Sequence, residues 1–202
     1  IQQYVDQDAS DKVSDFTCSG LSYDGHKGTD FALASSDMIA QGVDVLASAA
    51  GVVSGVRDGM EDVRFTSKNS QATEGRECGN GVVIRHDGGW QTQYCHMRQD
   101  SISVERGQQV QAGDVLGQVG MSGRAAFPHV HLSVRADGNV VDPFDPDGTI
   151  TCGEVDQNTL WSDLPPYRDG GIISIGTGAE VPEFSAVRDN SVPLPNAQSE
   201  AL

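Results

Sequence analysis

Polar and apolar side chains alternate most regularly in residues 127–134, which read F-P-H-V-H-L-S-V. After the proline, every second residue is polar, which is typical of a half-buried β-strand whose successive side chains point to opposite faces. His129 and His131 would therefore point to the same side of one rigid strand. Two imidazoles placed in this way indicate a site for a metal ion or for proton transfer.

Short alternating segments of this kind recur along the chain, and helix-length amphipathic runs are hard to find. Residues 79–86 and 90–97 read as the two strands of a hairpin joined by a glycine-containing turn at 87–89. Residues 42–56 contain two short strands of small side chains joined by a tight turn, and residues 99–120 contain further short strands. We therefore predict a mainly β protein.

Changes in composition predict three parts. Residues 1–17 are polar and acidic without a period, and we interpret them as an N-terminal arm. Residues 18–153 contain the alternating segments and form the predicted domain, with a long polar loop at residues 57–77. Residues 154–202 are proline-rich, so we expect a partly disordered extension in which the apolar run 172–175 forms one added strand.

The charge of the chain excludes several classes of partner. Its 202 residues carry a formal net charge of −16, which would repel the phosphates of nucleic acids and anionic membrane surfaces. No apolar run approaches the roughly 20 residues that a membrane-spanning helix needs. We expect neither a nucleic-acid partner nor a membrane span.

Four cysteines favour disulfide bonds over a thiolate metal site. Their number is even and no C-x-x-C spacing occurs, which fits two disulfides formed in an oxidising compartment. Four cysteines allow three connectivities. We favour Cys78 with Cys95, which lie on neighbouring segments of the predicted hairpin, and by elimination Cys18 with Cys152.

The other candidate ligands lie on separate segments. Gly25 and Gly28 argue against a helix, so His26 and Asp30 would lie on a turn that leads into a strand, where they could converge on one ion. On the second strand of the hairpin, strict alternation would place His96 on the same face as Tyr94, with the intervening cysteine on the other face. We assign no role to the remaining histidine, at the end of the hairpin.

These residues suffice for a catalytic zinc site. Such a site needs three nitrogen, oxygen or sulfur ligands and an open position for water. Two histidines and Asp30 meet that number and leave two histidines for acid–base chemistry and oxyanion binding. No H-E-x-x-H motif supplies a glutamate base. Spacing alone does not decide whether His129 or His131 is the ligand.

The motifs H-x-x-x-D at 26–30, Tyr94-x-His96 and H-x-H at 129–131 occur in an order that resembles the lysostaphin-type or LytM-type zinc metallopeptidases. These enzymes cut peptide cross-bridges of bacterial cell walls. The similarity spans roughly residues 20–145 and occupies every motif position. It implies an antiparallel β-sheet core, like a sandwich or barrel, with a groove walled by the loops at 57–77 and 121–127.

The resemblance also implies residue roles. His26, Asp30 and His131 would bind one zinc ion, and His96 and His129 would be the catalytic pair beside the open coordination position. One of that pair would accept a proton and the other would stabilise the oxyanion. The expected protein is a monomeric, secreted or periplasmic bacterial endopeptidase, acting on stem-peptide cross-links or cross-bridges of peptidoglycan.

Three alternatives remain open. The same site could cleave a glycine-rich protein such as elastin, which parallel digestion of elastin and cell wall would reveal. The chain could instead be a non-catalytic wall-binding module or amidase activator, which should purify without stoichiometric zinc. A structural β-domain with incidental histidines would require several coincidences of residue type and order.

Overall fold

A computed structural model describes residues 1–149 and 158–167 of the chain. The chain divides into two compact units, residues 1–169 and 170–202, and the second lies wholly outside the described residues. The added strand predicted at 172–175 therefore also lies outside them, as does Cys152. None of the helical segments within residues 1–149 and 158–167 has the length and apolar composition of a membrane-spanning helix.

The prediction of a mainly β protein is confirmed in this part of the chain. The strands are β1 (Thr29–Ala32), β2 (Asp44–Leu46), β3 (Gly51–Arg57), β4 (Asn80–Arg85), β5 (Trp90–Met97), β6 (Gln109–Val110), β7 (Val115–Gln118), β8 (His129–Ala136) and β9 (Asn139–Val141). The helical segments are short: α1 (Asp37–Gln41), η1 (Ser67–Asn69), α2 (Ser70–Thr73) and η2 (Asp87–Gly89).

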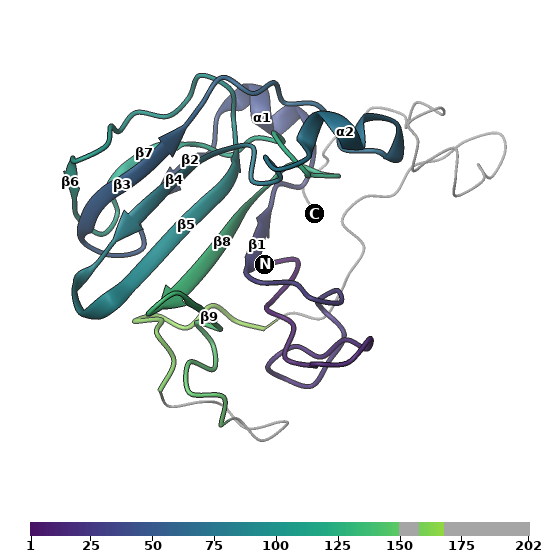
Figure 1. Ribbon diagram of the computed structural model, residues 1–202, viewed down its shortest axis with the longest axis vertical. Helices are drawn as coiled ribbons and strands as arrows, with labels where there is room; N and C mark the ends of the chain where they lie inside the picture. The colour runs from purple at the N-terminus through teal and green to yellow at the C-terminus, as the bar shows by residue number, and fades with distance from the viewer. Residues whose placement is uncertain (150–157, 168–202) are drawn as a thin grey trace, which may run out of the picture. The chain divides into compact units, whose positions relative to one another are not determined.

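Seven strands form one antiparallel sheet in the order β1-β8-β5-β4-β3-β6, with β9 paired to β8. Figure 1 shows β3, β4, β5 and β8 side by side. The described sheet is open, because β1 and β6 are its edges and do not pair with each other. A second, two-stranded sheet consists of β2 and β7.

The predicted hairpin is confirmed as β4 and β5, joined through the turn at Asp87–Gly89. The two small-residue strands within 42–56 also exist, as β2 and β3. They belong to different sheets, however, because β2 pairs with β7 and β3 pairs with β4 and β6.

The two faces of the large sheet have different roles. Val130, Leu132 and Val134 of β8 belong to the buried core, which includes residues of both sheets. Each such side chain contributes roughly 1.5–3 kcal/mol to folding through burial. His129 and His131 alternate with these valines and leucine, so they lie on the opposite face. We call these faces the core face and the site face.

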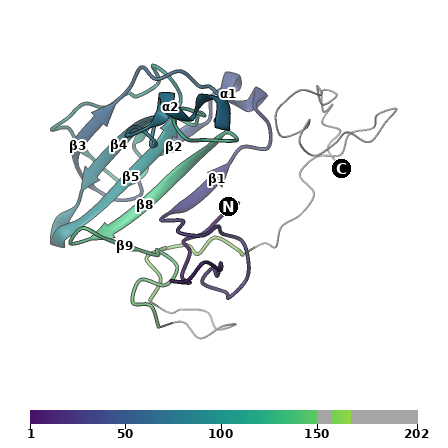
Figure 2. The ribbon, with the colours of Figure 1, turned by 45° about the vertical axis from the view of Figure 1, so that its right-hand side comes forward.

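The N-terminal arm is packed into the fold rather than extended in solvent. Its residue Gln3 forms a β-bridge with Asp30, and in both views the N-terminus lies beside β1 (Figures 1 and 2). The side chain of Tyr4 is 1% exposed and contacts the rings of Phe16, Phe144 and Tyr167. The sequence did not predict this packing, because the aromatic anchors are single residues without a period.

Candidate metal centre

Neighbouring strands bring Asp30 and His131 together although 101 residues separate them. In the register of β1 and β8, Asp30 lies directly opposite His131, and His129 lies opposite Ala32. Directly opposed residues of antiparallel strands point to the same face with their Cβ atoms about 5 Å apart. The site face therefore carries Asp30, His131 and His129 at the end of β1.

His26 reaches the same place from the loop that precedes β1. Its ring is buried, and its Nδ1 lies 2.6 Å from the backbone oxygen of Tyr4. This bond turns Nε2 toward the strand, where it lies 3.2 Å from Oδ1 of Asp30. Tyr23 stacks on the ring, with the centroids 4.3 Å apart, and covers its outer side.

The three candidate ligand atoms form a small triangle. Nε2 of His26 and Nδ1 of His131 are 3.1 Å apart, and Nδ1 of His131 lies 2.8 Å from Oδ1 of Asp30. Ligand atoms about 2.0–2.1 Å from a tetrahedral zinc ion would be roughly 3.3 Å from one another. The observed triangle is slightly tighter, so small side-chain movements suffice to admit an ion. Among the described residues, one group of histidine, cysteine or acidic side chains brings three possible ligand atoms within 4.8 Å of one another. It consists of His26, Asp30 and His131.

Hydrogen bonds on the far side of each ring indicate which nitrogen faces the centre with a lone pair. Ser133 donates its hydroxyl hydrogen to the backbone oxygen of Lys27, so at 3.2 Å it accepts a hydrogen bond from Nε2 of His131. The Nδ1 hydrogen of His26 is likewise given to Tyr4. With these tautomers both rings turn a lone pair toward the Asp30 carboxylate, which is the arrangement that a bound cation would use; without a cation, a ring hydrogen shared with Asp30 can take its place. The donor set fits a divalent metal ion.

His96 reaches the site face because of a β-bulge, and here the alternation prediction is wrong. In the register of β4 and β5, Tyr94 pairs with Val82 and Met97 pairs with Asn80, so Cys95 and His96 together face the single residue between them on β4. His96 has a φ of 62°, in the left-handed region. The bulge interrupts the alternation.

As a result, Tyr94 and His96 lie on opposite faces. Tyr94 belongs to the core and its hydroxyl bonds to Ser48, whereas Cys95 lies opposite His131 on the site face. The ring of His96 also lies on the site face, with its centroid 6.1 Å from that of His131.

His96 and His129 stand next to the candidate ligands and face each other. Their ring centroids are 4.7 Å apart, and Nε2 of His129 lies 3.7 Å from Oδ2 of Asp30. The Nδ1 hydrogen of each ring bonds to a backbone oxygen 2.8 Å away, from Ser122 for His96 and from Phe127 for His129. These bonds leave Nε2 of both rings available for a substrate or water.

Burial keeps this histidine pair neutral in the metal-free protein. Desolvation, followed by the neighbouring charge of His129, lowers the pKa of His96 from 6.5 to about 3. Desolvation also lowers the pKa of His129, although Asp30 opposes that shift. Burial alone would raise the pKa of Asp30, but hydrogen bonds with His131 and His26 outweigh it, and its pKa lies well below 3.8.

These shifts predict how the stability of the metal-free protein depends on pH. Between about pH 6.5 and about pH 3, the unfolded chain binds a proton at His96 that the folded chain does not, so stability falls as the pH falls. The contribution of His96 approaches about 1.4 kcal/mol per pH unit. Urea titrations at pH 7.5, 5.5 and 4.5 would measure it. His96→Asn should flatten the dependence, and an equally steep slope in that variant would contradict the assignment.

Two loops pack together beside this centre. Phe65, in the first loop, donates its backbone N–H to the oxygen of Ala125, and the guanidinium of Arg124 lies 5.2 Å from the centroid of the Phe65 ring. The loops predicted as walls, at 57–77 and 121–127, are therefore in contact. Hollows of about 450 and 260 Å³ lie between their residues.

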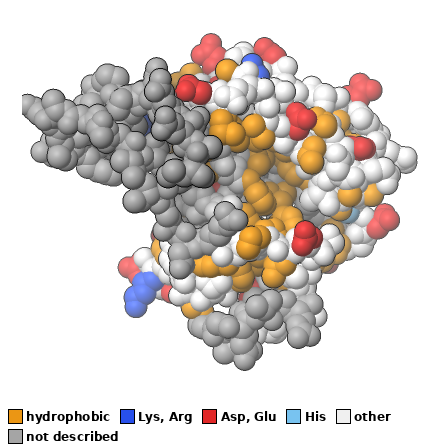
Figure 3. Space-filling model, turned by 180° about the vertical axis from the view of Figure 1, so that it is seen from behind, with side chains coloured by type: hydrophobic (Ala, Val, Ile, Leu, Met, Phe, Trp, Pro, Cys, Tyr) orange, Lys and Arg blue, Asp and Glu red, His pale blue; other side chains and the backbone are white. Residues whose placement is uncertain are grey.

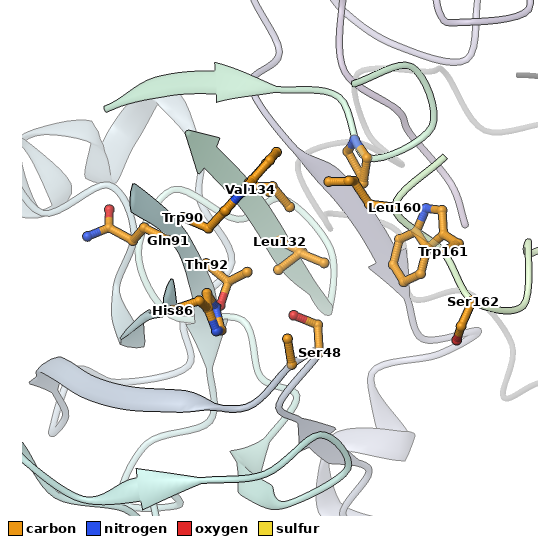
Figure 4. A pocket seen from close by; sticks show the side chains of 12 residues that line it. Ser48, His86, Trp90, Gln91, Thr92, Leu132, Val134, Leu160, Trp161 and Ser162 are labelled. Carbon is orange, nitrogen blue, oxygen red and sulfur yellow. The ribbon is translucent and has the colours of Figure 1, made fainter. Parts of the chain in front are cut away.

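A separate hollow lies on the core face, away from the candidate ligands. Its volume is about 320 Å³, and both tryptophans of the chain line it (Figure 4). Figure 3 shows hydrophobic side chains gathered on the side of the molecule turned away from the viewer in Figure 1. His86 also lines this hollow, with Nδ1 bonded to the Ala50 oxygen and Nε2 to the Thr92 hydroxyl, so it lies apart from the other histidines.

The predicted disulfide between Cys78 and Cys95 is present. It joins the loop before β4 to the bulged end of β5. Cys18 is not a free thiol. The predicted pairing of Cys18 with Cys152 lies outside the described residues.

Sequence reasoning missed the groups that orient the histidines. The oxygens of Tyr4 and Ser122 act through the backbone, which leaves no signal in residue type. The Ser133 hydroxyl could have been found, because it follows the two histidines on the same face of a predicted strand.

The family model described as "Peptidase family M23" matches residues 24–143. A DD-carboxypeptidase/endopeptidase of Neisseria meningitidis serogroup B is 42% identical over 65 residues, which are 32% of this chain and 14% of that protein. Peptidoglycan DD-endopeptidase ShyB of Vibrio cholerae is 38% identical over 64 residues, 32% of this chain and 15% of that protein. The chain thus aligns with only about a seventh of these relatives.

Among solved structures, the catalytic domain of the prophage-encoded M23 protein EnpA from Enterococcus faecalis is 26% identical to the chain. It aligns with 69% of this chain and 88% of its own, with a TM-score of 0.46.

Proposed function

The chain belongs to peptidase family M23, and from that premise we propose that it is a zinc-dependent endopeptidase of bacterial peptidoglycan that acts outside the cytoplasm. The observation that carries the proposal is that His26, Asp30 and His131 each place one possible ligand atom within 4.8 Å of the other two. Two further histidines lie beside them. The similarity to peptidoglycan DD-endopeptidases supports the substrate class.

We assign zinc as the ion because two imidazole nitrogens and one carboxylate match its common catalytic ligands. A zinc ion held by these residues supplies a Lewis acid, which polarises a carbonyl group and lowers the pKa of water to about 7. The hydrogen bonds that His26 donates to Tyr4 and that His131 donates to Ser133 fix the rings before any ion arrives, so little ordering is needed for binding.

His129 is proposed as the general base. Its free Nε2 accepts a proton from the attacking water, and the Asp30 carboxylate 3.7 Å away stabilises the resulting imidazolium. The same nitrogen then returns the proton to the leaving amine. His96 lies on the other side of this space. Because its Nδ1 hydrogen bonds to Ser122, Nε2 of the neutral ring carries a lone pair, which would accept a hydrogen bond from the attacking water and help to orient it.

The substrate would lie on the site face between the loops at 57–77 and 121–127. We propose that it is a stem-peptide cross-link or a cross-bridge of peptidoglycan. The net charge of −16 disfavours tight, unspecific adsorption to anionic wall polymers, so the loops rather than long-range attraction would select the substrate.

A digestion experiment tests this function. The full chain is incubated with defined cross-linked muropeptides, with and without a chelator, and the products are identified by mass. We expect cleavage that the chelator abolishes and that added zinc restores. Elastin digested in parallel reports the alternative protease activity. A folded, zinc-loaded protein that leaves every muropeptide intact would contradict the proposal.

A substitution at Ser133 tests whether the hydroxyl supports the metal site. Ser133→Ala removes the acceptor for Nε2 of His131, and loss of such a partner typically weakens metal affinity by roughly 10- to 100-fold. Competition with a chromogenic chelator would measure the change. Ser54→Ala is the control: it removes a hydroxyl on β3 that donates to the backbone oxygen of Val83 on β4, and it should bind zinc normally. Equal affinity in both variants would exclude the role of Ser133.

A further inference from the structure

The bulged end of β5 must be held in place for His96 to face the candidate centre. His96 is not a glycine, yet its φ is 62°. Non-glycine residues remain in this region only where the surrounding structure holds them there. The contacts of this segment therefore decide whether the ring stays beside His129.

Cys78 contacts the segment in two ways. Its backbone oxygen accepts a hydrogen bond of 2.8 Å from the N–H of His96, and its side chain forms the disulfide with Cys95. The covalent bond and the hydrogen bond thus act on consecutive residues of β5. At the bulge, the His96 N–H donates its hydrogen bond to this loop residue, which precedes β4.

The neighbouring residue on β4 leaves room for this arrangement. A Cβ atom on Gly81 would lie 2.9 Å from the sulfur of Cys78 and 2.4 Å from the oxygen of Tyr94. Only glycine at this position allows the disulfide and β5 to approach so closely. Because Cys95 lies opposite His131, the disulfide is also on the site face.

We propose that the disulfide between Cys78 and Cys95 is a positioning element for His96. It keeps the backbone oxygen of Cys78 within hydrogen-bonding distance of the His96 N–H. This hydrogen bond maintains the bulge and directs the ring toward His129. This inference rests on the proposed function for its effect on catalysis, but not for its effect on the ring. Without the crosslink, the loop before β4 can move away and the backbone of His96 can relax.

The test uses the full chain with both cysteines replaced, Cys78→Ala/Cys95→Ala, loaded with zinc. The matched control is Val53→Ala, a buried core substitution on β3, compared at a temperature where both variants are fully folded. Long-range proton–nitrogen NMR spectra of the five histidine rings report the tautomer of His96. Zinc content, kcat and KM on a muropeptide are measured on the same samples.

We expect wild type and Val53→Ala to show His96 as a single tautomer with hydrogen on Nδ1, bonded to Ser122. The double variant should show averaged ring signals, full zinc content, and kcat lowered roughly 10- to 100-fold with KM nearly unchanged. An unchanged His96 signal together with wild-type kcat would overturn the proposal and leave the disulfide a purely stabilising role. If no variant cleaves peptidoglycan while the ring signals still change, the proposed function fails and the positioning role stands.

Discussion

Asp30→Asn is expected to lose both bound metal and peptidase activity while the protein remains folded. The substitution keeps the shape of the side chain but removes the one negative charge among the three candidate ligands. Loss of a partner that merely hydrogen-bonds a ligand typically weakens metal affinity by roughly 10- to 100-fold, so we expect loss of a charged ligand to cost at least about 10²-fold. Elemental analysis after dialysis and kcat/KM on a muropeptide would measure the two losses.

The same substitution is also expected to change the thermal stability of the metal-free protein. Oδ1 of Asp30 lies 3.2 Å and 2.8 Å from ring nitrogens of His26 and His131, and hydrogen bonds with these rings hold the pKa of Asp30 below its ordinary value. The ionised carboxylate therefore stabilises the folded state at neutral pH. We expect the metal-free variant to unfold at a lower temperature than wild type at pH 7.

Asp44→Asn, at an exposed position of β2, is the control and should retain zinc and activity. Full zinc content in Asp30→Asn would show that the carboxylate is not a ligand. An unchanged unfolding temperature in the metal-free variant at pH 7 would contradict the stabilising role of the Asp30 charge.

His129→Ala is expected to lower kcat by roughly 10²- to 10⁴-fold while zinc remains bound, because general acid–base catalysis contributes about that much. His96→Ala should behave in the same way. Neither ring belongs to the cluster of candidate ligands, so zinc content should stay at one per chain. Single-turnover kinetics and elemental analysis on the same samples would separate catalysis from binding.

The double variant of this pair distinguishes a joint role from independent ones. Residues that act as a unit show non-additive effects, so the double variant should be about as slow as the slower single variant. His86→Ala is the matched control, since His86 bonds to Ala50 and Thr92 instead of facing the centre. Loss of zinc from His129→Ala, or an equal loss of kcat in His86→Ala, would contradict the assignment.

Local patterns in the sequence predicted much of the fold. The alternation through His129 and His131 predicted β8 and its polar face, because a strand buried on one side requires that period. The glycine-containing turn between two alternating segments predicted the hairpin of β4 and β5, which is also a pattern of residues close together in the sequence. The pairing of β1 with β8, which brings Asp30 opposite His131, depends on contacts across the chain and was not predicted; the resemblance to a known family implied only that the two residues bind one ion.

The remaining features depend on backbone geometry that residue types do not encode. The bulge at His96 reverses the face predicted from alternation, and a bulge is a change of register rather than of composition. The bond from Tyr4 to His26 uses a main-chain oxygen, which any residue could supply. The packing of the N-terminal arm through Tyr4 was not predicted, because the partners of that ring include residues far along the chain.

The most direct test is a crystal structure of the zinc-loaded protein with anomalous diffraction data collected at the zinc edge. The account predicts one peak about 2.0–2.2 Å from Nε2 of His26, Nδ1 of His131 and a carboxylate oxygen of Asp30, with an open side toward His96 and His129. A peak bound by other residues, or none between these three side chains, would contradict it.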